Sequence, residues 1–86
     1  MDEFESSLNK AVEAQRGRAG ISKKELSKRL GWGANLSRLN ARLSGESGWT
    51  TTEIDKVSKS LGLSDGWALL DLARQEQRLA DSGLAA

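Results

Sequence analysis

The side chains in this chain that could do chemistry form no catalytic set. The sequence contains no cysteine and no histidine, which excludes disulfides, the usual zinc sites and the usual proton shuttle at neutral pH. Its neighbouring carboxylates, Glu53 with Asp55 and Asp65 with Asp71, have no base, nucleophile or metal partner. The glycines around Trp32 lack the flanking strand and the Lys-Ser/Thr pair of a phosphate-binding loop. We therefore expect no enzyme activity, no bound metal and no cofactor.

The charged residues indicate instead one surface for an anion. The whole chain has 13 Lys and Arg residues and 12 Asp and Glu residues, for a formal net charge of +1. From Lys10 to Arg42, however, nine basic residues stand against two acidic ones, a local charge of +7, and the rest of the chain has four basic and ten acidic residues, a charge of −6. This layout is typical of a protein with an anion-facing surface, although a solvated helical face gives a similar charge run.

Apolar residues that recur every three or four positions predict five short helices. Sustained alternation at period two is missing and β-branched residues are few, so no strand is expected. The expected helices cover 3–16, stopped by Gly17 and Gly20; 23–30; a third from just after Gly33 to before Ser44; a fourth from after Thr50 to Gly62; and a fifth capped by Ser64 or Asp65. Leu79 could continue the apolar stripe of the fifth helix as far as about Ala80. The sequence thus predicts an all-α, compact five-helix domain over residues 1–74, with residues 75–86 as a C-terminal tail or helix extension.

Two segments match the capping box, in which an N-cap hydroxyl accepts a bond from the third helical N–H and a glutamate reaches back to the cap N–H. They are Ser22 with Glu25 and Thr50 with Glu53. Gly31 is expected to end the second helix in the left-handed conformation.

The most informative segment runs from Ile21 to Gly45 and contains a capped helix, a three-residue Gly-Trp-Gly turn at 31–33, and another helix. Two helices joined by so short a turn must cross steeply, which is helix-turn-helix geometry. With the leucines at 36, 39 and 43 facing inward, a rotation of about 100° per residue defines the opposite face. That outer face holds Ala34, Ser37, Arg38, Ala41 and Arg42, with Asn35 at its N-terminal edge.

The outer face has the composition of a surface that reads DNA bases. Ala34 and Ala41 are small enough to let the backbone approach base edges. Arg38 can make the paired contact to guanine, and Asn35 has the amide geometry that suits adenine. The candidate base-reading residues are Ala34, Asn35, Ser37, Arg38 and Ala41. The alternative is an exposed helix that simply carries small and basic residues.

Candidate contacts to the DNA backbone flank this segment. The start of the second helix presents free N–H groups and a positive dipole end, and Arg42 lies near the end of the third helix. The candidate phosphate contacts are Arg16, Arg18, Ser22, Lys23, Lys24, Arg42, Thr50 and Thr51. In the alternative interpretation Thr50 is only an N-cap, and Arg16 and Arg18 only solvate the turn after the first helix.

The three tryptophans are expected to pack inward. Trp32 and Trp67 are interpreted as core residues, because a domain this small needs large side chains to build buried area. Trp49 lies in the loop that would face DNA and could pack against sugar-phosphate, but covering the edge of the helical hairpin is the commoner fate of such a residue.

Several of these motifs together resemble a known family. They are the run Ile21 to Trp32 (ISKKELSKRLGW), the segment Leu36-Ser37-Arg38-Leu39, and a glycine at 45 that precedes Ile54, Val57 and Leu61-Gly62-Leu63. In order and spacing the chain resembles the lambda-repressor-like Cro/CI (Xre-type) helix-turn-helix family over residues 5–74. The resemblance implies a five-helix domain that places its third helix in the major groove, usually as a dimer on two half-sites. The chain departs from the family in a longer span from Leu30 to Gly45 and in Gly33, where a polar cap is more usual.

The sequence therefore favours a sequence-specific DNA-binding transcriptional regulator, such as a small phage or bacterial repressor of the Cro type. We expect it to act in the cytoplasm of a bacterium or a phage-infected host, on a double-stranded DNA operator, with a homodimer as a further expectation. No small-molecule ligand is expected. No membrane partner is expected either, because the apolar runs are far shorter than the roughly 20 residues of a membrane span and the chain starts with acidic residues.

The alternative function is a protein-interaction module, such as an antitoxin-like protein or a regulatory subunit. Under this hypothesis Leu79 and Leu84, in an otherwise polar C-terminal stretch, form a dimer seam or bind a partner. A disordered end would have the same composition.

Overall fold

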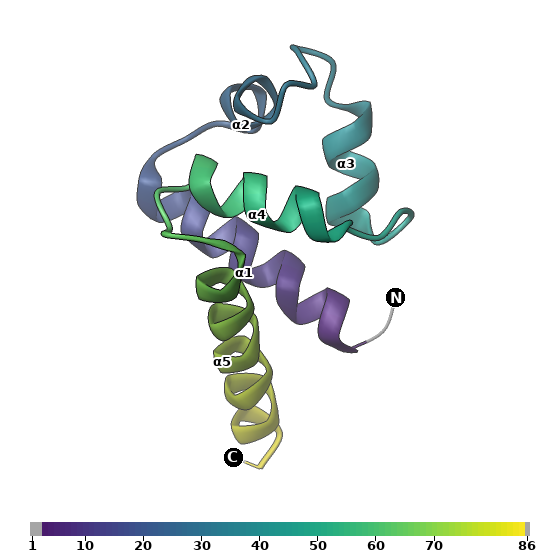
Figure 1. Ribbon diagram of the computed structural model, residues 1–86. Helices are drawn as coiled ribbons and strands as arrows, with labels where there is room; N and C mark the ends of the chain where they lie inside the picture. The colour runs from purple at the N-terminus through teal and green to yellow at the C-terminus, as the bar shows by residue number, and fades with distance from the viewer. Residues whose placement is uncertain (1–2, 86) are drawn as a thin grey trace.

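The computed structural model describes residues 3–85, and these residues form five helices and no strand (Figure 1). The helices are α1 (Glu3–Ala19), α2 (Lys23–Arg29), α3 (Ser37–Ser44), α4 (Thr51–Ser60) and α5 (Gly66–Ala85). The all-α prediction with five helices is confirmed. Within the described residues, none of the helices has both the length and the apolar composition that crossing a bilayer requires.

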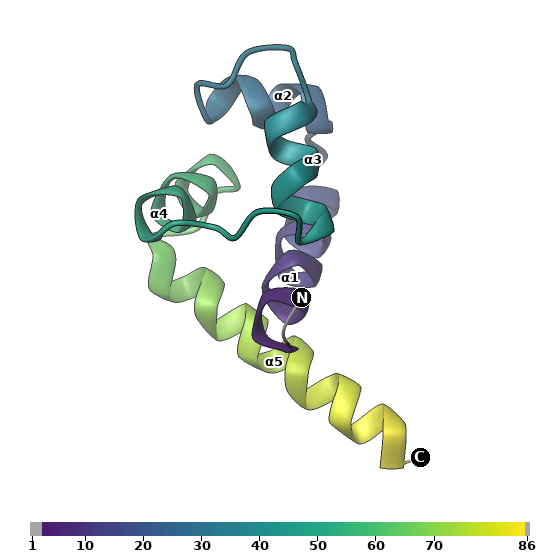
Figure 2. The ribbon, with the colours of Figure 1, turned by 90° about the vertical axis from the view of Figure 1, so that its right-hand side faces the viewer.

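The helices pack around one core to which all five contribute. α1 and α5 make the most extensive helix contact, and α4 packs on α5 next to them. α2 and α3 lie at the end of the molecule opposite the C-terminal end of α5, as Figures 1 and 2 show. The buried apolar residues are Leu8, Ala11, Val12, Ile21, Leu26, Leu30, Leu39, Val57, Leu61, Leu69 and Ala73. α3 is therefore a short helix fixed through Leu39 to a core that the other helices build.

The first helix is longer than the sequence predicts. α1 continues through Gly17 to Ala19, whereas an end at Arg16 was expected. One glycine inside a helix costs about 1 kcal/mol, which the contact between α1 and α5 outweighs. The helix ends at Gly20, whose φ of 68° is left-handed, with bonds from Gly20 N to Gly17 O (3.2 Å) and from Ile21 N to Arg16 O (3.2 Å). This pair of bonds is a Schellman motif.

One of the two expected capping boxes is complete. Thr50 Oγ1 accepts a bond from Glu53 N (3.2 Å), and Thr50 N donates to Glu53 Oε1 (3.1 Å), which confirms the prediction for α4. At the start of α2, Ser22 Oγ accepts from Glu25 N (3.1 Å). The Glu25 carboxylate accepts instead from Arg29 Nε (3.2 Å), one turn along the helix. Ser22 is thus confirmed as an N-cap, and Glu25 supports α2 through an i,i+4 ion pair.

The connection between α2 and α3 is longer than the three-residue turn that the sequence predicts. It covers residues 30–36, so α3 begins at Ser37, and both Ala34 and Asn35 lie ahead of the helix. The left-handed φ of 73° at Gly33 interrupts any helix there. The Asn35 Oδ1 atom accepts a bond from Ser37 N (2.9 Å), an Asx turn that starts α3. The predicted start of the third helix directly after Gly33 is therefore wrong.

Two aromatic residues lie at the surface, and one of them, Trp67, was expected to face inward. Phe4 is 43% exposed and Trp67 is 75% exposed. On α5 the core-facing positions belong to Leu69 and Ala73, and Trp67 lies two positions before Leu69, on the opposite side of the helix. The interpretation of Trp67 as a core residue is wrong.

The fifth helix runs without interruption across residue 74 to Ala85. Leu79 is 66% exposed on its second half. Leu84, the other leucine of the expected seam, lies outside the part of the chain whose side chains the structure describes.

Candidate nucleic-acid interface

The outward side of α3 is polar. Ser37, Arg38, Asn40 and Ser44 are exposed, Ala41 is half-buried, and Leu39 is completely buried. Ala34 and Asn35 are exposed as well, but they belong to the connection before the helix. The structure therefore brings Ser37, Arg38 and Ala41 together on one helix, and it places the other two candidate base-reading residues beside the start of that helix.

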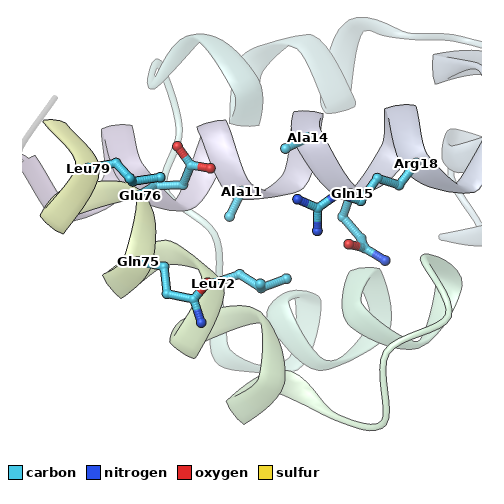
Figure 3. Close-up of a pocket in the computed structure, with 8 residues that line it drawn as sticks. All are labelled: Ala11, Ala14, Gln15, Arg18, Leu72, Gln75, Glu76 and Leu79. Atoms are coloured by element: carbon cyan, nitrogen blue, oxygen red, sulfur yellow. The ribbon is translucent and has the colours of Figure 1, made fainter. Parts of the chain in front are cut away.

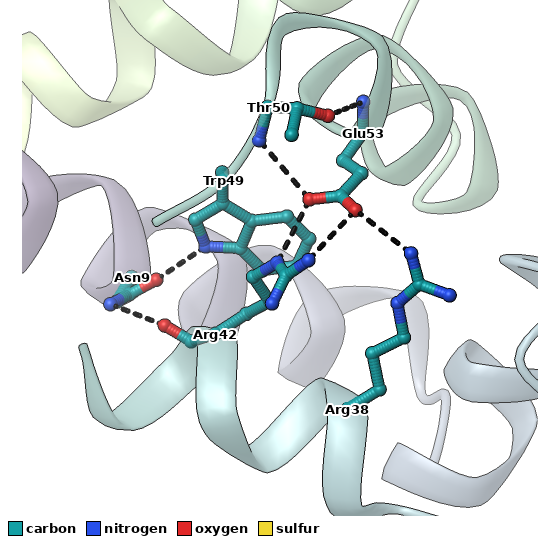
Figure 4. A network of polar contacts seen from close by, with 6 residues as sticks. All are labelled: Asn9, Arg38, Arg42, Trp49, Thr50 and Glu53. Carbon is teal, nitrogen blue, oxygen red and sulfur yellow. Dashed lines mark hydrogen bonds and ion pairs between the residues drawn. The ribbon is translucent and has the colours of Figure 1, made fainter. Parts of the chain in front are cut away.

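Arg42 does not lie on the outward side, and its expected position there is wrong. Its guanidinium makes a two-pronged contact with Glu53 of α4, with Nε 2.8 Å from Oε1 and Nη2 3.0 Å from Oε2 (Figure 4). The two side chains are only 13% and 10% exposed. Compared with the prediction, α3 is rotated about its axis so that Arg42 faces α4. The Glu53 carboxylate compensates the charge of the partly buried arginine there. The same rotation exposes Asn40.

The electrostatics of this pair are strongly perturbed. Hydrogen bonds from the Arg42 side chain, together with the bond from the Thr50 N–H and the nearby charges of Arg42 and Arg38, lower the pKa of Glu53 from its ordinary value of 4.5 to about 2 against the opposing effect of burial. The same bonds with Glu53 raise the pKa of Arg42. The pair is thus ionised at all physiological pH values and ties α3 to α4.

A second set of contacts supports α3 from α1. Trp49 Nε1 donates to Asn9 Oδ1 (2.7 Å), and Asn9 Nδ2 donates to the backbone oxygen of Arg42 (3.1 Å). The rings of Trp32 and Trp49 stack with centroids 6.2 Å apart and an angle of 24° between their planes. Figure 4 shows Asn9 of α1 bonded both to Trp49 and to the backbone of Arg42, and the Arg42 side chain bonded in turn to Glu53 of α4. The inward packing of Trp32 and Trp49 is confirmed.

Arg38 is held near this network but remains accessible. Its side chain is 58% exposed, with Nη2 3.6 Å from Glu53 Oε2. The guanidinium carbon lies 4.8 Å from the centroid of the Trp32 ring, a cation–π contact. The Glu53 carboxylate is therefore shared by the guanidinium groups of Arg42 and Arg38. It compensates one positive charge, and the remaining charge lies on the exposed Arg38.

The other predicted basic contacts are divided between two parts of the molecule. Arg16 is 22% exposed, pairs with Glu13 (2.7 Å) and donates to Ile21 O (3.0 Å), so it closes the turn between α1 and α2. The bond with Glu13 raises the pKa of Arg16. Arg18 is exposed and borders a small hollow between α1 and α5 that no residue of α3 lines (Figure 3). The structure does not bring these two arginines to the outward side of α3.

The remaining candidates lie at the starts of α2 and α4. Ser22 and Lys24 are exposed and Lys23 is half-buried at the start of α2. Thr50 is exposed, but its hydroxyl already caps α4, which supports the N-cap alternative. Thr51 is exposed in the first turn of α4.

Three residues of the site were not predicted from the sequence. Asn40 is close to the leucine stripe by rotation angle, so periodicity alone hides its exposure. Glu53 carries a capping-box signal in the sequence, but nothing in the sequence names Arg42 as its partner. Asn9 interrupts the expected apolar side of α1, and a buried polar residue at such a position is the one signal that could have found it.

Within the described residues, no group of three or more Asp and Glu side chains gathers where it could hold a metal ion. Fold and site together define an all-helical protein in which α3, a short helix with two arginines, is fixed to α1 and α4 by polar contacts. No protein-family model, curated protein sequence or solved structure gives a significant match to the chain.

Proposed function

We propose that this protein is a sequence-specific DNA-binding transcriptional regulator with a lambda-repressor-like helix-turn-helix fold, and that the outward side of α3 enters the major groove. The single observation that carries the proposal is the state of Arg38. It is an accessible guanidinium on a short polar helix, held over Trp32 and beside Glu53. An arginine on a helix in the major groove is the commonest specific reader of guanine.

The surroundings of Arg38 support this role. Ser37 and Ala41 are small, so the backbone of α3 can approach base edges closely. The ion pair of Arg42 with Glu53 and the bonds through Asn9 fix α3 against α4 and α1. A reading side chain that sits on a rigid element loses little conformational entropy on binding, which favours discrimination between bases.

In this proposal Asn40, and not Asn35, makes the adenine contact. The Asn35 oxygen already accepts the bond that starts α3, so a paired contact to adenine would undo that turn. Asn40 presents an exposed carboxamide from within α3 and takes the role of amide reader. The Lys23 and Lys24 side chains at the start of α2 provide contacts to phosphate, which position the helix without reading sequence.

The test begins with selection of bound sequences from random DNA, followed by titration of the full chain with the selected duplex. We expect one enriched motif. A palindromic motif would support binding as a homodimer, because the symmetry of the site mirrors that of the protein. If no sequence is enriched and all duplexes bind equally, sequence-specific regulation is the wrong function.

Two variants separate reading from positioning. Arg38→Ala should lose about 1–3 kcal/mol of discrimination at one base pair of the selected site. Lys24→Ala should weaken all sequences alike and lower the slope of log affinity against log salt by about one. Arg74→Ala removes the same charge from an exposed position on α5 and should leave both quantities unchanged. Loss of discrimination in Arg74→Ala as large as in Arg38→Ala would contradict the assignment of Arg38.

A further inference from the structure

An apolar groove lies between α1, α4 and α5, away from α2 and α3. Its volume is about 580 Å³, and it is bounded by Phe4, Ile54, Asp55, Asp65, Trp67 and Leu70; we call it the Trp67 groove. Trp67 and Phe4 are two of the three large hydrophobic residues that stand exposed among the described side chains, at 75% and 43%. Large apolar side chains gathered in one exposed groove usually mark a contact surface.

The position of Trp67 is fixed by the backbone around it. Asp65 Oδ1 accepts a bond from Ala68 N (3.1 Å), and Asp55 Oδ1 accepts from Gly66 N (3.2 Å). The start of α5 passes so close to α4 that a Cβ on Gly66 would lie 3.3 Å from Ile54 Cγ2. The first turn of α5 is therefore anchored on α4, and the exposure of Trp67 follows from this anchoring.

The charge around the groove is mainly negative. Asp55 and Asp65 line it, and Asp71 is exposed one helical turn after Trp67. Lys59 Nζ lies 2.9 Å from Asp55 Oδ2 and compensates that carboxylate first, and its charge acts only weakly on Asp65. Asp65 and Asp71 thus leave an acidic rim beside an apolar floor, in contrast to the basic stretch that contains α2 and α3.

We propose that the Trp67 groove binds a basic amphipathic segment of a partner protein. An apolar side chain of the segment enters between Phe4 and Trp67, and its lysines or arginines lie against Asp65 and Asp71. An amphipathic helix laid into an apolar groove is a common mode of peptide recognition, and charge complementarity at the rim selects a basic partner over an acidic one.

This inference goes beyond DNA binding and does not depend on it. The groove contains no residue of α2 or α3, and it shares with the proposed DNA contacts only Thr51 at its edge. One chain can therefore hold DNA through α3 and a partner through the Trp67 groove at the same time.

The probes are synthetic amphipathic peptides of about 15 residues, long enough for four helical turns. One has leucines on one face and lysines on the other, a second has the same leucines with glutamates, and a third has the lysines with serine in place of leucine. Titration calorimetry of the full chain should give at least about tenfold tighter binding of the leucine-lysine peptide than of the other two.

Variants locate the binding in the groove. Trp67→Ala should weaken the leucine-lysine peptide at least about tenfold, because an aromatic anchor in a pocket carries much of the affinity of such an interface. Asp71→Lys should weaken it severalfold and favour the glutamate peptide. Glu25→Lys makes the same charge change on exposed α2 and should change binding little.

Three results would overturn the proposal. The first is equal binding of the leucine-lysine peptide to Trp67→Ala and to the natural chain. The second is equal binding of the lysine and glutamate peptides, since the groove would then select no charge. The third is self-association of the full chain in sedimentation that Trp67→Ala abolishes, because the occupant would then be a second copy. None of these results bears on DNA binding, which the selection experiment tests separately.

Discussion

The aromatic residues of this protein occupy two regions with opposite character. Beside α3, Trp32 and Trp49 stack on each other, and Trp49 donates its ring N–H to the buried Asn9. At the start of α5, Trp67 leaves three quarters of its surface to solvent above the acidic rim of its groove. The first region uses its aromatic rings to brace a helix, whereas the second presents a ring for contact.

The difference shows that the contacts of a tryptophan, and not the size of the domain, decide whether it is buried or exposed. A small core does need large side chains, but leucine, isoleucine, valine and alanine make up the buried core here, and Trp32 and Trp49 pack against it only partly buried. Trp32 and Trp49 also contact the polar network around Arg42 and Glu53: Arg42 lies over the Trp32 ring, and Trp49 bonds Asn9. If this contrast is correct, substitutions beside α3 should cost stability, and substitutions in the Trp67 groove should cost very little.

The largest effect is expected from Glu53→Ala. The substitution leaves the guanidinium of Arg42, whose side chain is 13% exposed, without its carboxylate and removes half of the capping box of α4. Breaking such a pair typically costs about 3–5 kcal/mol, a large part of the 5–15 kcal/mol that stabilises a small domain. Urea unfolding followed by circular dichroism measures the loss.

Glu25→Ala is the matched control, because it also removes a glutamate paired with an arginine near the start of a helix. The side chains of that pair are 46% and 50% exposed, so the loss should stay below about 1 kcal/mol. Equal losses in the two variants would show that the contact between α3 and α4 is an ordinary surface ion pair.

Acid should weaken the contact between α3 and α4. The pKa of Glu53 is lowered to about 2 from 4.5, so its ionisation contributes stability that is complete above pH 4.5 and is lost as the pH falls toward 2. The shift corresponds to roughly 3 kcal/mol at neutral pH. Asp55, whose pKa is lowered mainly by its bond with Lys59, contributes in the same direction. Unfolding free energies measured between pH 7 and pH 2 test this.

In Glu53→Gln most of this pH dependence should disappear, because the amide cannot titrate. The variant should be less stable than the natural chain at pH 7 and should approach it at pH 2. A slope that persists unchanged in Glu53→Gln would assign the acid sensitivity to other carboxylates.

Much of the fold could be predicted from local chemistry. Ser22 and Thr50 cap their helices as their hydroxyls indicate, and Gly31 ends α2 in the left-handed conformation. The leucine at 39 is buried as its spacing requires. These features depend on residues within one helical turn of each other, and the sequence contains all the information that they need.

Apart from the start of α3, which Gly33 and the turn at Asn35 set locally, the failures depend on contacts between distant segments. Arg42 faces inward because Glu53, eleven residues later, meets it there. Gly17 stays helical because α5 packs on α1, and Trp67 faces outward because α5 turns Leu69 to the core. Periodicity defines a stripe on a helix but not the rotation of that helix against its neighbours, so the outward residues of α3 could be predicted only in part.

A medium effect is expected where Trp49 meets Asn9. Trp49→Phe keeps an aromatic ring for the stack with Trp32 but removes the 2.7 Å hydrogen bond to Asn9 Oδ1. The net loss should be about 1–2 kcal/mol in urea unfolding. A double-mutant cycle with Asn9→Ala should give a coupling of about 1 kcal/mol. A coupling near zero would mean that the bond contributes nothing to holding α3.

The smallest effect is expected from Trp67→Ser. Because the ring is 75% exposed and the first turn of α5 is anchored through Asp55 and Asp65, the free energy of unfolding should change by less than about 0.5 kcal/mol. The fluorescence emission of the folded protein should at the same time shift to shorter wavelength, since only the shielded Trp32 and Trp49 remain. The small change in stability and the shift in emission together would show that Trp67 is exposed while Trp32 and Trp49 are packed. A loss of more than about 1 kcal/mol, the size expected for a ring that packs on the protein, would place Trp67 with the bracing tryptophans and leave the groove without its exposed anchor.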